Sequence, residues 1–484
     1  MEGDLFLISL CIILINFSCV GILLFKLFLL NGDPIHLDPD IFLKALKFTL
    51  VQAFLSASAS VIVGLVAAPG YSRLGVFQKP ARWILLFPSL MSQILIVLGL
   101  LLSFKNFPYG MRGIVLGHVF LNGGLCAVWL GEAWKTLEEK WAPVNFVLGG
   151  SKRRYFLKII LPQMRGGIFS TFTVVFSFCL SSFAIPLVFG GGPQASTLEV
   201  LIYEQLRATG ELNSSLLIAL SQILIQALVY VLILRTHQNI SRPRFLLRKL
   251  ETGGILILVP LALLLFSALP ILQVFKTALP QLRNLSYIGP DFFDAITNSL
   301  TVGLFLSLLV FLILPILAAQ KYTVLLFRIP TLSGVVVGIA SLILLNSIDT
   351  SSRIFFLTCL LYGHFCVIFL AIGRLAEPKI TELNNLYSKT IDQLGIDSGL
   401  AIKRVYLPLE KRFFASAAVL AGIWSIGEFS VSRVLSGEYM TIPVFIETLL
   451  SSYRLEMAAG ASLILLALTV LSLTVLEGVI NGLG

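Results

Sequence analysis

The residues that could do chemistry in this sequence are few, and they stand inside long apolar runs. Glu428, His118 and His364 are ionisable side chains in segments that are otherwise hydrophobic, and Ser182 stands 246 positions before Glu428. Charged groups are costly in a bilayer and tend to face protein or a water-filled pathway. One interpretation places these four residues along a pathway for a cationic solute. The alternative pairs Glu428 with Arg433 and makes the histidines hydrogen-bonding links between helices.

No other arrangement of residues indicates catalysis, a cofactor or a metal site. The chain has no Gly-Lys pair, so it lacks a phosphate-binding loop of the G-x-x-x-x-G-K-[ST] type. The six cysteines lie in apolar runs without a Cys-x-x-Cys pair, which is typical of small core residues. We therefore expect neither an enzyme nor a bound cofactor or metal, and any ATP that drives this protein must be hydrolysed by another chain.

Two polar segments of matching layout interrupt the apolar chain. Residues 149–163 read GGSKRRYFLKIILPQ, and residues 395–409 read GIDSGLAIKRVYLPL. Each begins with a glycine and has a proline as its next-to-last residue, with a leucine directly before the proline and an apolar residue three positions before it. The residues are Gly149, Ile159, Leu161 and Pro162 in the first stretch, and Gly395, Val405, Leu407 and Pro408 in the second. Glycine permits a tight turn, and proline is tolerated at the start of a helix. We call residues 149–162 the first basic segment and residues 395–408 the second basic segment. Each is thus predicted to form a tight turn followed by a short helix. A helix resting on anionic lipid is the alternative.

Composition determines the elements that must position these residues. Of 484 residues, 57% are hydrophobic and only 12% are charged, about half the charge of a soluble domain. Apolar runs of about 20 residues, long enough to cross a bilayer, recur along the chain. We predict an all-α membrane protein with about twelve transmembrane helices, at 5–30, 42–68, 83–104, 113–133, 166–190, 212–234, 253–275, 295–320, 331–348, 354–373, 413–434 and 459–481.

Lysine and arginine are divided unevenly between the loops, which predicts an orientation. The loops near 69–82, 134–165, 235–252, 321–330 and 374–412 hold most of the 35 basic residues. The loops on the other side hold only Lys105, Arg112, Arg207, Lys276, Arg283, Arg353 and Arg454. Cytoplasmic loops carry such an excess, so we expect both termini in the cytoplasm. The same asymmetry accounts for the net charge of +10 and argues against a nucleic acid partner.

The chain repeats itself. Besides the two basic segments, LGHVF at 116–120 corresponds to YGHFC at 362–366, and STLEVLIYEQ at 196–205 corresponds to MTIPVFIETL at 440–449. We predict two parallel six-helix repeats, residues 1–240 and 241–484, with long inward loops at 134–165 and 374–412. An even number of spans in each unit makes such a repeat parallel.

Each predicted repeat also has an outward element between its fifth and sixth helices. In the first repeat the element contains Gly191, Gly192, Pro193, Glu199 and Tyr203; in the second it contains Thr441 and Pro443. We expect Thr441 to cap a short helix with Pro443 in its first turn. Such an interfacial helix would form a lip that meets a soluble partner. The alternative is a loop that only seals the helix bundle.

These residues resemble a known family. The layout Gly-x9-hydrophobic-x-Leu-Pro is similar to the later part of the cytoplasmic coupling loop of binding-protein-dependent ABC importer permeases, although the Glu-Ala-Ala part of that loop is replaced here by Pro143-Val144-Asn145 and Lys389-Thr390-Ile391. The resemblance implies that both basic segments dock on a cytoplasmic ABC ATPase dimer. It also implies a periplasmic substrate-binding protein at the outward elements, and a multi-pass location in a bacterial inner membrane.

Three stretches resemble the thiamine branch of this family, in which two permease halves are fused in one chain. They are GHVFLN at 117–122, SSFAIPLVFGGGPQASTLEVLIYEQL at 181–206, and the set SIGEFSV, TIPVFI and SSYR at 425–431, 441–446 and 451–454. The resemblance implies a small-molecule cargo, with thiamine favoured and ferric iron as the alternative. A secondary transporter driven by an ion gradient would need charged residues in mid-helix, and this chain has almost none.

Overall fold

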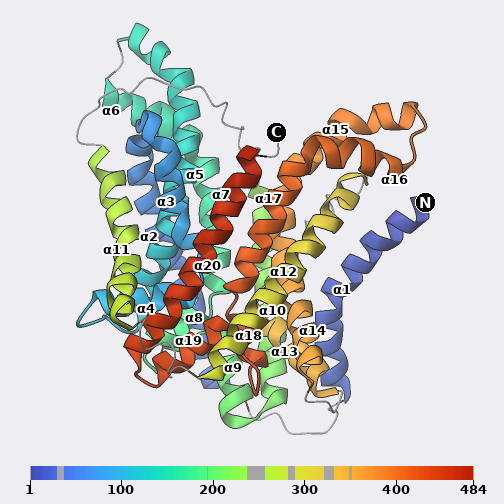
Figure 1. Ribbon diagram of the computed structural model, residues 1–484. Helices are drawn as coiled ribbons and strands as arrows, with labels where there is room; N and C mark the ends of the chain where they lie inside the picture. The colour runs from blue at the N-terminus through green and yellow to red at the C-terminus, as the bar shows by residue number, and fades with distance from the viewer. Residues whose placement is uncertain are drawn as a thin grey trace. The chain divides into compact units, whose positions relative to one another are not determined.

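The structure is a computed structural model that describes residues 2–29, 37–149, 151–192, 195–236, 257–281, 289–320, 332–347 and 352–482. Every regular element in these ranges is a helix (Figure 1). Eight of the described helices are long and apolar enough to cross a membrane, and a ninth span results if one bent pair is counted as a single span. The predicted all-α membrane fold is therefore confirmed, while the count of twelve spans stays a prediction.

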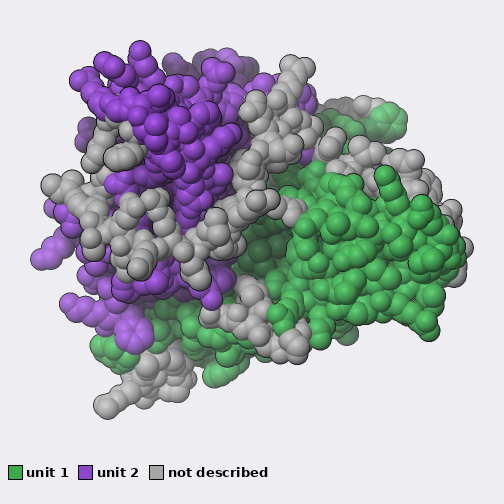
Figure 2. Space-filling view, turned by 90° about the horizontal axis from the view of Figure 1, so that it is seen from above, with its two compact units in different colours: residues 1–37, 202–223, 277–484 green, residues 38–201, 224–276 purple. Residues whose placement is uncertain are grey.

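The chain divides into two compact units, coloured separately in Figure 2. Unit 2 comprises residues 38–201 and 224–276. Its helices are α2 (Pro39–Tyr71), α3 (Gln78–Leu90), α4 (Gln93–Ser103), α5 (Met111–Val147), α6 (Lys152–Tyr155), α7 (Leu161–Leu180), α8 (Ala184–Phe189), most of α9 (Leu198–Glu204), the end of α10 (Leu212–Thr236) and nearly all of α11 (Leu258–Ala278).

Unit 1 comprises residues 1–37, 202–223 and 277–484. It contains the end of α9, the start of α10, and α1 (Glu2–Leu29), α12 (Pro290–Ala318), α13 (Gly334–Ser347), α14 (Arg353–His364), α15 (Leu370–Gln393), α16 (Ser398–Ala401), α17 (Leu407–Ile426), α18 (Ser430–Leu435), α19 (Ile442–Ser451) and α20 (Leu455–Gly482).

The first helix of each predicted repeat packs in the unit built mainly from the other repeat. In unit 1, Ser18 Oγ of α1 lies 2.6 Å from the hydroxyl of Tyr362 on α14. In unit 2, the rings of Phe120 on α5 and Phe266 on α11 lie 5.3 Å apart. The compact units thus differ from the sequence ranges 1–240 and 241–484, whose boundary as a repeat stays a prediction.

Small side chains explain how α2 packs in unit 2. A buried small residue recurs every three or four positions on α2, at Ala53, Ala57, Ser60, Gly64 and Ala68. Without a hydrophobic driving force between helices in lipid, small residues favour association because they let backbones approach closely. A Cβ atom on Gly64 would lie only 2.4 Å from Cβ of Cys126 on α5, so this crossing requires glycine.

Three segments expected as continuous spans are broken helices. The segment 83–104 bends by 101° between its two helices, where Met91 and Ser92 have extended backbones. The segment 166–190 is divided into α7 and α8, and 413–434 into α17 and α18. Each break frees backbone N–H groups from helical bonds, and such groups need polar partners at membrane depth. The polar residues Ser181, Ser182 and Glu428 stand at the last two breaks.

Candidate functional site

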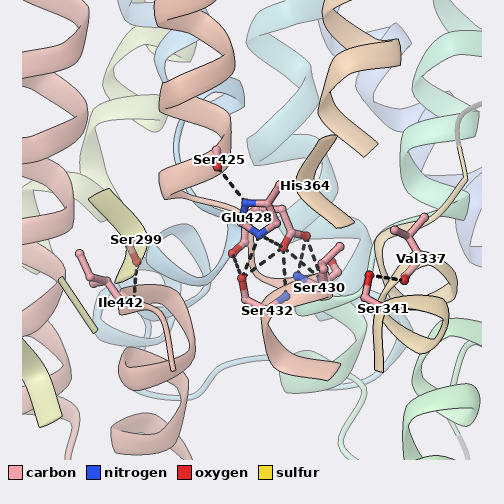
Figure 3. A network of polar contacts seen from close by, with 10 residues as sticks. Ser299, Val337, Ser341, His364, Ser425, Glu428, Ser430, Ser432 and Ile442 are labelled. Carbon is pink, nitrogen blue, oxygen red and sulfur yellow. Dashed lines mark hydrogen bonds and ion pairs between the residues drawn. The ribbon is translucent and has the colours of Figure 1, made fainter. Parts of the chain in front are cut away.

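The N-terminal end of the short helix α18 is held by a buried carboxylate. Glu428 accepts hydrogen bonds from the backbone N–H groups of Ser430 at 2.8 Å, Val431 at 3.1 Å and Ser432 at 3.2 Å (Figure 3). The first N–H groups of a helix have no partner within the helix, and a negative charge there also complements the helix dipole. The Glu428 side chain is only 10% exposed, so its first role in this structure is to cap α18.

His364 joins this carboxylate to two other helices. Its Nε2 lies 3.3 Å from Oε2 of Glu428, and its Nδ1 lies 2.8 Å from Oγ of Ser425 near the end of α17. Figure 3 shows the His364 ring between Ser425 and Glu428. Because His364 is the last residue of α14, the contact connects α14, α17 and α18 at a single buried point.

The opposite end of α18 is held by a positive charge. The Nη2 atom of Arg207 donates to the backbone oxygen of Val434 at 2.6 Å and to that of Ser436. The last carbonyl groups of a helix lack partners within it, and a cation there complements the dipole. Arg207 comes from the outward element of the first predicted repeat. The sequence analysis did not select it as a site residue, although it is one of the few basic residues in the loops predicted to face outward.

An ion pair lies on the same short helix, α18. Nε of Arg433 lies 2.9 Å from Oε2 of Glu447 on α19, and its guanidinium lies 5.4 Å from the centre of the Tyr203 ring. Burial raises the pKa of Tyr203, so its ring stays neutral and attracts the cation above it. The expectation that Arg433 pairs with Glu428 is wrong, since the helix break turns Glu428 toward α18. We call Arg207, His364, Glu428, Arg433 and Glu447 the α18 network.

The corresponding position in unit 2 is built differently. His118 is fully buried, and its Nδ1 lies 3.0 Å from Oγ of Ser56 on α2. Ser182, 2% exposed, takes the place that Glu428 has in the second repeat. In the part of the chain that the structure describes, Oγ of Ser182 has no hydrogen-bond partner. A pathway role for Glu428, Ser182, His118 and His364 stays a prediction.

The first outward element begins with left-handed glycines. Gly191 has φ of 74° and Gly192 of 125°, conformations that favour glycine. Pro193 lies outside the described residues. Glu199 is fully buried on α9, and Leu198 at the start of this helix donates its N–H to Oγ1 of Thr49 at 2.9 Å.

The second outward element is capped by a residue from another helix. Thr441 precedes α19, but its side chain makes no capping hydrogen bond, so the expected cap is wrong. Oγ of Ser299 on α12 accepts from the N–H of Ile442 at 2.9 Å instead. Pro443 stands in the first turn of α19 as expected. The cap is tertiary, which local spacing does not reveal.

The two basic segments have the same backbone. Gly149 has φ of 64° and Gly395 of 59°, and each is followed by a four-residue helix and then a π-helical turn, Phe156–Ile160 or Ile402–Tyr406. Pro162 and Pro408 stand in the first turn of α7 and α17. A proline ring clashes with the carbonyl four residues earlier and favours such a wider turn. The π-helical turn leads directly into α7 in the first segment and into α17 in the second, where the helix is kinked at Glu410.

Each basic segment is anchored by a residue that the sequence analysis missed. Ile160 is fully buried and belongs to the same apolar cluster as Trp134 of α5. Tyr406, 2% exposed, packs edge-on against Tyr387 of α15 with ring centres 6.4 Å apart. Both anchors follow directly after a residue that the spacing had selected, Ile159 or Val405.

The other side of each basic segment lies on the surface of its own unit. Five basic side chains are exposed there: Arg153, Arg154, Lys158, Lys403 and Arg404. Pro162 and Pro408 are also exposed, whereas Ile159, Leu161, Val405 and Leu407 are partly exposed. Leu157 and Leu400 add exposed apolar surface, 47% and 43% exposed. A surface that mixes apolar and basic side chains in this way suits a protein partner.

Replacing Arg207 by alanine is expected to lower the melting temperature of the protein. The change removes hydrogen bonds from a charged group, each contributing about 1.5–3 kcal/mol where it is shielded from water, and releases the C-terminal end of α18. Thermal unfolding in detergent would be compared with that of Arg112→Ala, which removes another exposed arginine. Equal melting temperatures of the two variants would show that Arg207 does not hold α18.

Comparison with known proteins finds relatives along most of the chain, whereas no protein-family profile matches it. The thiamine transport system permease protein ThiP of Escherichia coli is 26% identical over 479 residues, covering 89% of this chain and 88% of the relative. ThiP of Brucella suis is 28% identical over 387 residues, covering 74% and 69%. The putrescine transport system permease protein PotI of Escherichia coli is 27% identical over 181 residues, covering 35% and 64%.

Proposed function

We infer that this chain is the membrane-spanning permease subunit of an ATP-driven importer of the ABC class, and we propose that its cargo is thiamine. The observation that carries the proposal is the similarity to thiamine permeases over 89% of the chain. Thiamine and putrescine, which the relatives' names specify, are both organic cations, and this favours an organic cation over ferric iron.

The proposed coupling runs through the two basic segments. Their exposed apolar and basic side chains would dock on a separate ATPase dimer, one segment for each ATPase subunit. Because the chain is helical through α7 and, beyond a kink at Glu410, through the rest of α17, a displacement at each segment is carried along that helix. Residues 411–426 of α17 span about 24 Å. Figure 1 shows α17 extending from the side of α15 and α16 to that of α18 and α19.

A contact beside the second basic segment supports this transmission. The α17 backbone leaves helical geometry at Glu410 (φ −124°, ψ 24°), and Oε1 of Glu410 lies 2.7 Å from Nζ of Lys379 on α15. This ion pair ties α17 to α15 close to Pro408. At its other end α17 carries Ser425, the partner of His364. ATP-driven movement of the segment would thus reach the α18 network and change the contacts that fix the position of α18.

The proposed orientation places both basic segments and both termini in the cytoplasm of a bacterial cell. The outward elements and the α18 network then face the side from which a soluble binding protein delivers cargo. We propose alternating access, in which closure of the ATPase dimer acts on both basic segments and opens the pathway outward, and ATP hydrolysis resets the permease. Glu428 would add a negative potential near the outer part of the pathway, which favours a cationic cargo.

Reconstitution tests the proposal. The chain would be placed in lipid vesicles with an ABC ATPase and a soluble binding protein from the same organism. ATP-dependent uptake of labelled thiamine is expected, and an excess of unlabelled thiamine should suppress it while ferric iron does not. Vesicles without the ATPase serve as the control. Uptake that follows an ion gradient and does not depend on the ATPase would overturn the proposed class, and uptake of ferric iron alone would overturn the cargo.

A further inference from the structure

Tyr453, in the turn between α19 and α20, has an unusual backbone for its residue type. Its φ is 58°, and it is the single non-glycine residue with positive φ in the part of the chain that the structure describes. Its side chain is 92% exposed. A non-glycine residue in the left-handed region places Cβ close to the following carbonyl oxygen, which costs free energy.

The turn around Tyr453 is one that normally contains glycine. The N–H of Tyr453 donates to the backbone oxygen of Leu450 at 3.0 Å, and the N–H of Arg454 donates to that of Leu449 at 2.9 Å. This pair of hydrogen bonds is typical of a helix that ends with a left-handed residue, most often glycine. The turn that ends the matching helical stretch of the first predicted repeat uses Gly210, with φ of 74°, as its left-handed residue, one position further along in the register of the repeat. The second repeat therefore carries a tyrosine where the backbone favours glycine.

Nothing within the described chain compensates for this choice. The ring is almost fully exposed, so it buries little apolar surface. Its neighbours Ser451, Ser452 and Arg454 are exposed as well. A strained residue that does not stabilise the fold indicates a function outside it. Tyrosine and arginine side by side are also the residue types most enriched among the energetically dominant positions of protein interfaces.

The turn is linked to the α18 network and lies far from the second basic segment. Oγ of Ser451 lies 2.6 Å from Oε1 of Glu447, whose other oxygen pairs with Arg433. Figure 1 shows α19 near α18, toward the end of α17 opposite α16. If the basic segments face the cytoplasm, as the proposed function requires, this turn faces the side where cargo is delivered.

We propose that Tyr453 and Arg454 anchor the soluble binding protein that delivers cargo to this permease. The Tyr453 ring inserts into an apolar pocket of the partner, and carboxylates at the rim of that pocket meet Arg454. Docking is then coupled to α18 through Ser451, Glu447 and Arg433. A lipid surface is the less favoured occupant, because the neighbours of the ring are polar and an interfacial tyrosine needs no left-handed backbone. The inference rests on the proposed function.

The experiment compares docking with stability. Tyr453→Gly and Tyr453→Asn both suit the left-handed turn and lack the ring, whereas Ser452→Ala removes an exposed hydroxyl from the same turn as a control. Affinity for the purified binding protein, and the ATPase stimulation that it causes, would be measured on the permease–ATPase complex in lipid nanodiscs. Thermal unfolding of each variant would be followed in parallel.

We expect both Tyr453 variants to weaken docking at least tenfold while their Tm stays unchanged or rises by about 1–2 °C. The Ser452→Ala control should dock as the parent does. Unchanged docking by Tyr453→Gly and Tyr453→Asn would overturn the proposal. Variants that insert poorly into the membrane but still dock normally would also overturn it, because that result would assign the ring to lipid. If the unmodified complex is not stimulated by its binding protein at all, the proposed function fails first.

Discussion

Valine in place of Gly149 or Gly395 is expected to abolish ATP-driven uptake while the protein still inserts into the membrane. Both glycines have left-handed backbones, and valine is strongly disfavoured there because its Cβ and branched methyl groups clash with the local backbone. An added Cβ atom would meet nothing else within 4 Å, so its strain comes from the backbone of the turn. The turn must then open by rearranging its backbone, which misdirects the basic segment that follows. Uptake and ATPase activity of the reconstituted complex would be measured together.

A matched pair of variants separates conformation from the loss of a small residue. Asparagine tolerates the left-handed region, so Gly149→Asn and Gly395→Asn should keep most of the uptake. Gly167→Ala is the helical control, because this glycine of α7 also has open space around it and lacks a positive φ. Normal uptake by both valine variants would show that the basic segments do not couple ATP hydrolysis to transport.

Glu428→Ala is expected to destabilise the protein by about 3–5 kcal/mol, because it removes a buried carboxylate that accepts from three backbone N–H groups. The N–H groups of Ser430, Val431 and Ser432 lose their acceptor, and each unsatisfied buried group costs about 1–3 kcal/mol. Thermal unfolding in detergent should show a clearly lowered Tm. Uptake should fall even where the folded fraction is restored at lower temperature, since α18 is no longer held at its N-terminal end.

Two further variants sharpen this result. Glu438→Gln changes an exposed carboxylate just beyond α18, and it should alter stability by no more than about 0.5 kcal/mol. Glu428→Gln keeps one acceptor oxygen but turns an NH₂ group toward other donors, so its stability should fall between the parent and Glu428→Ala. A Tm for Glu428→Ala equal to that of Glu438→Gln would show that the carboxylate does not hold α18.

Much of the fold was predictable because it depends on short-range patterns. The lengths of the apolar runs predicted membrane helices, and the spacing of Gly149 and Pro162 predicted a turn and a helix at the right place. The breaks between α7 and α8 and between α17 and α18 were not predicted, since apolar residues continue on both sides. Polar pairs such as Ser181 and Ser182 were the available signal, because freed backbone groups at membrane depth need polar neighbours.

The sequence by itself determined that this is a helical membrane protein with two matched basic segments, because hydrophobicity and residue spacing act locally along the chain. Only the tertiary structure decided the partners of the polar groups around α18. Glu428 turned to His364 and the start of α18, Arg433 to Glu447, and Arg207 to the end of α18. Those choices depend on where broken helices bring their unsatisfied N–H and C=O groups in space, which no spacing along a single chain reveals.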